Sequence, residues 1–394
     1  IDISGFTALS ERLARRGRVG SEELVGVLNR VFGSMLREVY QRGGSLIKFG
    51  GDALFLMFDG DDHVLHAASA AVGMRRSLRE SSRIPTSVGR LHLRMSIGLE
   101  SGPIHMFRAG RIHHEMLVVG PTATAVSLME STADASEIVV GPTTRRLLPA
   151  GSADRPKGDG FVLSWRTERI APSGIVDRGL THPPAIRMGV PVELRDLLAS
   201  GALENEHRTG NIAFVEFRGV DERLAADGPA VVAELIDEFV CAAAEEALEE
   251  GVTFLATDLG KDGGKVLLST GAPFTKEDDE GRMLRACRGI LERGTALRCR
   301  IGVNRGHVFT GEIGTPFRST YVVMGDTTNL AARMMSAAST GEIYAAPQIV
   351  ARARTLFETT VVPPFSAKGD PDRLRATSGG SVEKLVVLTD QPSP

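Results

Sequence analysis

Two stretches, residues 45–58 (SLIKFGGDALFLMF) and residues 254–270 (FLATDLGKDGGKVLLST), decide the fold of this chain. Each contains two apolar runs separated by a glycine pair, Gly50–Gly51 in the first and Gly263–Gly264 in the second. Such a pair predicts a tight β-hairpin turn, because glycine adopts positive φ angles at both turn positions. The two stretches therefore predict two hairpins of the same kind.

Other blocks of the chain recur in the same order, which indicates a long internal repeat. Within the hairpins, Lys48 aligns with Lys261 and Asp52 aligns with Lys265. The further aligned pairs are Asp2 with Glu216, Leu93 with Leu297, Gly102 with Gly306, and Gly120 with Gly325. One domain is thus expected to occur twice, and we refer to a first copy and a second copy.

Both copies predict the same fold. Apolar residues keep the helical spacing at Leu24, Leu28 and Val31 in the first copy and at Val232 and Ile236 in the second. Each of these helices precedes a hairpin. The order strand, helix, hairpin, helix, strand predicts an antiparallel-rich sheet with helices on one face, a ferredoxin-like α+β fold. We place the first copy at residues 1–166, a linker rich in Pro and Gly at 167–209, and the second copy at 210–394.

Composition excludes several classes of partner. The net charge of -3 gives no basic field that would attract nucleic acid. No apolar run reaches the roughly 18 residues of a membrane span. The 3 cysteines show no C-x-x-C spacing, which favours a reducing, cytoplasmic location. The chain starts without Met inside an expected strand, so we treat it as a fragment and expect further modules outside it.

Two aspartates in apolar surroundings, Asp2 and Asp52, indicate a cation, because a buried carboxylate is costly without one. On neighbouring strands they would hold two Mg²⁺ ions, as in nucleotidyl transfer. The residues that follow, Gly5, Phe6 and Thr7, lead into a helix whose first amides suit phosphate oxygens. Taken one at a time, a helix cap at Asp2 and a turn residue at Asp52 are the simpler interpretation.

Three motifs, taken together, resemble one enzyme family. DISGFTALSE (residues 2–11), IKFGGDALF (47–55) and GDTTNLAARMM (325–335) occur in this order within a tandem repeat. The combination is similar to the class III nucleotidyl cyclases, and most to the tandem-domain type of the soluble adenylyl cyclases and their bacterial relatives. The resemblance covers nearly the whole chain. It implies an intramolecular pseudo-heterodimer with one active site between the copies.

The resemblance also implies a division of roles between the copies. The metal ligands, for two Mg²⁺ or Mn²⁺ ions, match Asp2, Asp52 and the carbonyl of Ile3. The transition-state pair matches Asn329 and Arg333, which lie four residues apart and so share one helix face. The first copy carries Thr124 and Leu128 at the places of this pair. The implied substrate-binding residues are Gly5, Phe6, Thr7, Gly51, Lys261, Val322, Val323 and Lys368.

The implied substrate is ATP, converted to 3′,5′-cyclic AMP and pyrophosphate. Lys261 matches the lysine that reads the purine, and an ammonium group suits the N1 acceptor of adenine. Val322 stands where the family carries an acceptor for the adenine amino group, so the carbonyl of Val323 is an alternative. Lys368 resembles the lysine that holds the triphosphate. A guanylyl cyclase and a non-catalytic nucleotide-sensing module remain the alternative interpretations.

A second, pseudo-symmetric site is implied at Lys48, Ser127, Glu216 and Lys265, and we call it the pseudo-site. In related enzymes a lysine and an arginine hold bicarbonate there. Lys48 matches the lysine, but Ser127 stands in place of the arginine. The simpler expectation is a closed vestige in which Lys265 pairs with Glu216.

Overall fold

The structure is a computed structural model that describes residues 1–51, 53–81, 85–90, 93–164, 188–200, 204–315, 318–362 and 385–388. The elements of the first copy are β1 (Asp2–Ser4), α1 (Phe6–Ala14), α2 (Gly17–Tyr40), β2 (Ser45–Gly50), β3 (Ala53–Met57), α3 (His63–Ser81), β4 (Pro85–Thr86), β5 (Gly89–Arg90), β6 (Arg94–Leu99), β7 (His105–Ala109), β8 (Glu115–Val119), α4 (Pro121–Thr132), β9 (Ile138–Val140), α5 (Pro142–Leu147), β10 (Arg155–Lys157) and β11 (Gly160–Val162).

A helix, α7 (Val192–Ser200), precedes the second copy. The elements that follow are β12 (Glu206–Arg218), α8 (Val220–Glu250), β13 (Thr253–Gly260), β14 (Gly263–Thr270), α9 (Asp279–Glu292), β15 (Cys299–Thr315), β16 (Arg318–Met324), α10 (Asp326–Ala337), β17 (Ile343–Ala345), α11 (Pro347–Val350), β18 (Thr359–Val362) and β19 (Leu385–Leu388). The expected linker at 167–209 thus contains α7 and the start of β12.

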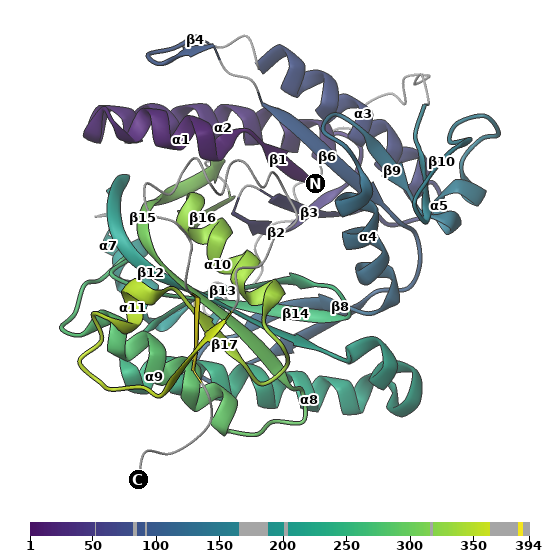
Figure 1. Ribbon diagram of the computed structural model, residues 1–394. Coiled ribbons are helices and arrows are strands. Elements are labelled where there is room, and N and C mark those ends of the chain that lie inside the picture. Colours follow the sequence, from purple (N-terminus) through teal and green to yellow (C-terminus); the bar gives the residue numbers. More distant parts are fainter. Residues whose placement is uncertain are drawn as a thin grey trace.

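The two copies have the same sheet topology. The strand order is β10-β11-β9-β6-β1-β3-β2 in the first and β18-β19-β17-β15-β12-β14-β13 in the second. Asp2 of β1 pairs with Ser96 of β6, and Glu216 of β12 pairs with Arg300 of β15. The predicted tandem α+β fold is confirmed. Figure 1 shows the first copy (purple to blue) above the second (teal to yellow), with α2 and α3 on one outer face and α8 and α9 on the other.

Each helical layer buries the apolar face that the sequence predicts. Leu28 and Val31 of α2 are fully buried in the first core, and Val232 and Ile236 of α8 are fully buried in the second. Each side chain of this kind contributes roughly 1.5 to 3 kcal/mol relative to an exposed one. The opposite face of each sheet is turned toward the other copy (Figure 1).

The two hairpin turns differ from the expected glycine-pair turns. In the first copy Gly50 ends β2 and pairs with Ala53, so the turn begins at Gly51, whose φ is 66°. In the second copy Gly260 pairs with Gly263, which makes Lys261 and Asp262 the turn. The glycine pair that follows lies in β14, where close packing requires it: a Cβ on Gly264 would lie 2.7 Å from the Phe217 ring.

The copies interlock through two reciprocal arms. The β7–β8 hairpin of the first copy places Ala109, Leu117 and Val119 in the second core. In return, β15 places Phe309 and Ile313, and β16 places Val322, in the first core. Backbone amides at the arm tips reach across as well. Gly110 N donates to Asp237 Oδ1 at 2.8 Å, and Gly314 N donates to Asn29 Oδ1 at 2.9 Å. Each core is therefore completed by the other copy.

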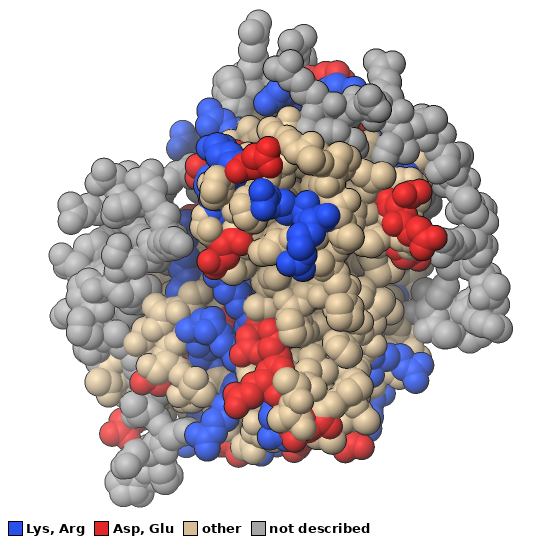
Figure 2. Space-filling model, turned by 90° about the vertical axis from the view of Figure 1, so that its right-hand side faces the viewer, with Lys and Arg blue, Asp and Glu red and all other residues tan. Residues whose placement is uncertain are grey.

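Helix α7 packs where these arms meet. Leu194 is 3% exposed, and Arg195 Nη2 donates to the carbonyl of Ile112 at 3.1 Å. No helix in the described ranges is long and apolar enough to cross a bilayer. Acidic and basic side chains are interspersed on the face drawn in Figure 2, with no broad basic patch there.

Candidate active site

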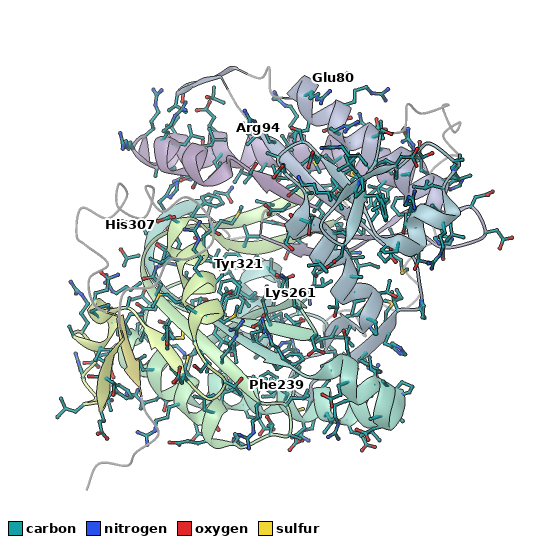
Figure 3. The ribbon with its side chains drawn as sticks, turned by 45° about the vertical axis from the view of Figure 1, so that its right-hand side comes forward. Glu80, Arg94, Phe239, Lys261, His307 and Tyr321 are labelled. Atoms are coloured by element: carbon teal, nitrogen blue, oxygen red, sulfur yellow. The ribbon has the colours of Figure 1, made fainter. Side chains whose placement is uncertain are left out.

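A cleft lies between the two copies and is lined by both, and we call it the composite cleft. The first copy contributes Leu28, Phe49 and Gly51, from α2 and the β2–β3 hairpin. The second contributes side chains of β12, β13, β14, β16 and α10, among them Tyr321 and Asn329. Tyr321 lies where the copies meet in Figure 3. The cleft therefore brings the first hairpin and α10 to one place.

Asp2 lies in the middle of the first sheet, on β1 between Ala53 of β3 and Ser96 of β6. Burial raises the pKa of its carboxyl to about 6, and the negative charge of Glu130 adds to the shift. Ser96 Oγ donates to Glu130 Oε1 at 2.6 Å and so fixes this second carboxylate on α4. Asp2 is thus a carboxylate that a bound cation would stabilise.

The residues expected around a metal fit it in part. Carboxylate and carbonyl oxygens are the ligands Mg²⁺ prefers, and Asp2 and the backbone of Ile3 supply them on β1. Asp52 lies outside the described residues, as does Lys368. Within the described ranges no three His, Cys, Asp or Glu side chains surround a common point. The observation that favours a cation is therefore the buried carboxylate of Asp2, whose pKa is raised to about 6.

Helix α1 starts directly after β1. Gly5 precedes it with φ 103°, a left-handed conformation that glycine adopts without strain. Phe6 and Thr7 form the first turn, and their side chains lie outside the description. The first amides of a helix have no partner within the helix, and those of α1 follow the end of β1 at Ser4. This is a suitable place for phosphate oxygens.

Helix α10 carries the expected transition-state pair. Asn329 lines the cleft, and Arg333 follows one turn later and is partly buried. Two hydrogen bonds hold the start of α10 against β15. Thr327 Oγ1 donates to the carbonyl of His307 at 2.8 Å, and Asn304 Nδ2 donates to the carbonyl of Thr327 at 3.0 Å. The helix is thereby fixed at the side of the cleft opposite the first hairpin.

Strand β16 forms another part of the wall. Val322 and Val323 line the cleft and are 6% and 3% exposed. They are the residues expected to face the purine. Their side chains offer an apolar surface and no hydrogen bond, so any polar contact to a base from these two residues comes from the backbone.

Lys261, the residue expected to read the base, lies on the hairpin of the second copy. It is exposed at the turn between β13 and β14 and is not among the residues that line the cleft. Its neighbour Asp262 donates its amide to Thr124 Oγ1 at 3.0 Å, so this turn contacts α4 of the first copy. Counted back from the two turns, the position of Lys48 corresponds to Asp258 and not to Lys261.

Asp258, which the sequence did not indicate as a site residue, lines the composite cleft. It lies on β13, with its carboxylate next to Gly50 of the first copy. The only signal for it in the sequence is a single acidic residue within an apolar strand, three positions before the first turn residue.

The pseudo-site is occupied by side chains of the protein. Lys48 Nζ lies 3.1 Å from Glu115 Oε2 and also contacts Thr257 Oγ1. Glu115 accepts hydrogen bonds from the amide and hydroxyl of Thr257 at 3.0 and 2.6 Å. Burial alone would raise the pKa of Glu115, but the charge of Lys48 and hydrogen bonds from His113 and Thr257 outweigh it and lower the pKa to about 2. These contacts join the two copies.

The expected pair between Lys265 and Glu216 is wrong. Glu216 Oε2 instead lies 2.6 Å from Arg300 Nη2 and 3.0 Å from Arg218 Nε. Lys265 is the cross-strand neighbour of Glu216 on β14, but a guanidinium fork matches a carboxylate better than an ammonium does. Ser127 is partly buried on α4. The place that corresponds to Asp2 is therefore neutralised by arginines.

The chain belongs to the family of adenylate and guanylate cyclase catalytic domains, whose model matches residues 1–165 and 281–379.

Individual relatives are similar at low identity. Adenylate cyclase type 10 of Homo sapiens is 26% identical over 379 residues, which cover 85% of this chain and 23% of that protein. Adenylate cyclase type 10 of Oryctolagus cuniculus is 24% identical over 97% of this chain and 26% of its own length. A membrane guanylyl cyclase of Dictyostelium discoideum is 30% identical over 41% of this chain and 10% of its own. The chain thus spans about a quarter of the length of the first two relatives.

A solved structure shows the same fold over both copies. The class III adenylyl cyclase-like ATP-binding protein from Pseudomonas aeruginosa has a TM-score of 0.60 at 12% identity and covers 89% of this chain and 84% of its own.

Proposed function

We propose that the chain is an adenylyl cyclase that converts ATP to 3′,5′-cyclic AMP and pyrophosphate in the composite cleft. The observation that carries the proposal is the meeting of Gly51, from the first copy, and Asn329, from the second, in one cleft. ATP is favoured because the relatives that match most of the chain are named adenylate cyclases.

In the proposed reaction the ribose 3′-oxygen attacks the α-phosphorus. The bond from this phosphorus to the bridging oxygen of the β-phosphate breaks, pyrophosphate leaves, and the hydroxyl proton passes to solvent. Asp2, the Ile3 carbonyl and Asp52 would hold two Mg²⁺ or Mn²⁺ ions. Bound there, the ions supply positive charge to the triphosphate and lower the pKa of the 3′-hydroxyl.

The other roles fall to α1 and α10. Amides at the start of α1, after Gly5, bind phosphate oxygens. Asn329 orients the ribose by hydrogen bonding, and Arg333 donates to the oxygens on which charge develops in the transition state. Arg333 follows the lining residue Asn329 by one helical turn, so the two residues share one face of α10. Lys368 stays a proposed contact of the triphosphate.

GTP is a second candidate substrate, favoured by one observation. Adenine is expected from a base-reading lysine at Lys261, but Lys261 is not among the residues that line the cleft, whereas Asp258 is.

The three cysteines are free and buried, which supports the cytoplasmic location that we propose.

The test is to incubate the purified chain with ATP or GTP and Mg²⁺ or Mn²⁺ and to identify the product by mass spectrometry. Cyclic AMP with an equal amount of pyrophosphate is expected. Tight binding of nucleotide with no cyclic product would refute the proposal and favour a nucleotide-sensing module.

A further inference from the structure

A second cavity lies between the two copies beside helix α7, and we call it the α7 cavity. Its volume is about 560 Å³, which suits a small organic molecule. It is lined by β2, β7 and β8 of the first copy, by α7 and the residues before it, and by β13 and β16 of the second copy. Of the four pseudo-site residues, Lys48 borders it, whereas Ser127, Glu216 and Lys265 do not. Asn329 of the composite cleft does not line it either, so the α7 cavity differs from both sites.

The buried wall of the α7 cavity is apolar. Leu194 and Leu198 line it from α7, and Val190 lines it just before the helix. Leu255 of β13 and Tyr321 of β16 line it from the second copy. Leu194, Leu255 and Tyr321 belong to one buried cluster. Because apolar surface leaves water readily, the cavity suits a molecule with an apolar body.

Two arginines at the edge of the cavity have no carboxylate partner. Arg108 of β7 and Arg318 of β16 line it and are exposed, and neither forms an ion pair within the part of the chain that the structure describes. Arg318 Nη2 donates to the carbonyl of Ile47 at 2.8 Å, which holds this guanidinium against β2. The ammonium of Lys48 is already paired with Glu115. The edge therefore carries two guanidinium groups, which bind a carboxylate by charge-assisted hydrogen bonds.

The α7 cavity and the composite cleft share a wall. The residues that line both are Phe49, Leu255, Ala256, Thr320 and Tyr321. Helix α7 is also tied to the first copy, because the amide of His114 donates to the carbonyl of Met188 at 2.5 Å. A ligand in the α7 cavity would thus contact side chains that also border the composite cleft. Its affinity and that of a nucleotide in the cleft would then depend on the same arrangement of this wall.

We propose that the α7 cavity is an effector site for an amphipathic carboxylate, a molecule with an apolar chain or ring system and one carboxylate group. The apolar body packs against Leu194 and Leu255, and the carboxylate accepts hydrogen bonds from Arg108 and Arg318. Occupancy of the cavity changes the affinity of the composite cleft for nucleotide through the shared wall. By linkage, a nucleotide in the cleft changes the affinity for the carboxylate by the same factor.

Binding of decanoate to the full chain, measured by calorimetry, tests the site. Decanoate should bind, decanol, which lacks the charge, should bind roughly tenfold more weakly, and acetate, which lacks the apolar body, should not bind measurably. Arg318→Gln should weaken decanoate binding roughly tenfold, and the double variant Arg108→Gln/Arg318→Gln should weaken it further. Arg298→Gln is the matched control, since Arg298 is an exposed arginine of the second copy that does not line the cavity. Its affinity for decanoate should not change.

A second measurement tests the effector role. The dissociation constant of 3′-deoxy-ATP with Mn²⁺ should change roughly fivefold or more when decanoate is saturating, and this change should be lost in the folded double variant. No binding of decanoate, or equal affinity for it in the unchanged chain and the double variant, would overturn the site. No effect of decanoate on nucleotide binding would overturn the effector role. Both measurements are of binding, so a chain that binds ATP without cyclising it would refute the proposed function and leave this inference standing.

Discussion

The carboxylate of Asp262 accepts a hydrogen bond from the backbone amide of Gly219 at 3.0 Å. Its other oxygen accepts from the amide of Asp221 at 2.8 Å, and its carbonyl accepts from the amide of Val220 at 3.1 Å. These amides begin α8, and the start of a helix is an anion-binding position. In the second copy this position is filled by a carboxylate of the protein, whereas in the first copy Gly5 begins the helix expected to bind phosphate.

Restoring an acidic residue to the second copy should not produce a second active site. In Lys265→Asp, Asp262 still fills the start of α8, and Thr124 and Leu128 still offer neither an amide nor a guanidinium. We expect one 3′-deoxy-ATP bound per chain and turnover no higher than in the unchanged chain. Calorimetry in the presence of Mn²⁺ gives the stoichiometry. Two bound nucleotides per chain would mean that the roles of the copies have been assigned wrongly.

Glu115 should contribute strongly to stability, because it joins the copies. In Glu115→Ala, Lys48, whose side chain is 19% exposed, loses its charged partner, and the amide of Thr257 loses its acceptor. Breaking a buried pair in this way costs roughly 3 kcal/mol or more. Urea denaturation measures the loss. Glu312→Ala, which removes an exposed carboxylate from the β15 arm, is the control and should change the free energy of unfolding by less than about 0.5 kcal/mol. Equal effects would contradict the joining role.

The same carboxylate predicts an acid-sensitive stability. The pKa of Glu115 is about 2 in the folded chain against 4.5 for an ordinary glutamate, so the folded state favours the ionised form. Its contribution is fully present above pH 4.5, declines as the pH falls toward 2, and is absent below that value. Melting temperatures measured between pH 6 and pH 2.5 should fall more steeply in the unchanged chain than in Glu115→Gln. Parallel curves would argue against this assignment.

Arg333 should act on the transition state more than on binding. We expect Arg333→Ala to lower kcat roughly a hundredfold or more, because one preorganised donor to developing charge is lost. KM should change much less, since that charge is small in the ground state. Arg333→Lys, which keeps the charge but not the fork, should recover part of kcat. A large rise in KM with unchanged kcat would instead make Arg333 a substrate-binding residue.

The sequence predicted the duplicated fold well. The same apolar spacing and the same order of elements occur in both copies, and they indicate the helices and strands of each. Leu28 and Ile236, for example, are buried as expected. The position of a turn within a hairpin is less determined, since glycine serves both turns and close packing. Gly263 and Gly264 serve packing, which moves Lys261 to an exposed turn and places Asp258 in the cleft.

Contacts between the copies could not be predicted, because they depend on how two folded units meet. Glu115 and Thr257 are in contact but lie 142 residues apart in the sequence, and no local pattern relates the two. The choice of Arg300 as the partner of Glu216 likewise depends on the pairing of β12 with β15.

A mixing experiment with two full-length variants tests most directly that one active site is built from both copies of the same chain. Asp2→Asn alters the first copy and Arg333→Ala the second, and circular dichroism checks that both fold. Each variant alone should have roughly one hundredth of the normal cyclase turnover or less, and an equimolar mixture should stay as low, because every chain carries a lesion in its one site. Normal turnover in either variant, or recovery of activity on mixing, would contradict a single composite site within the chain.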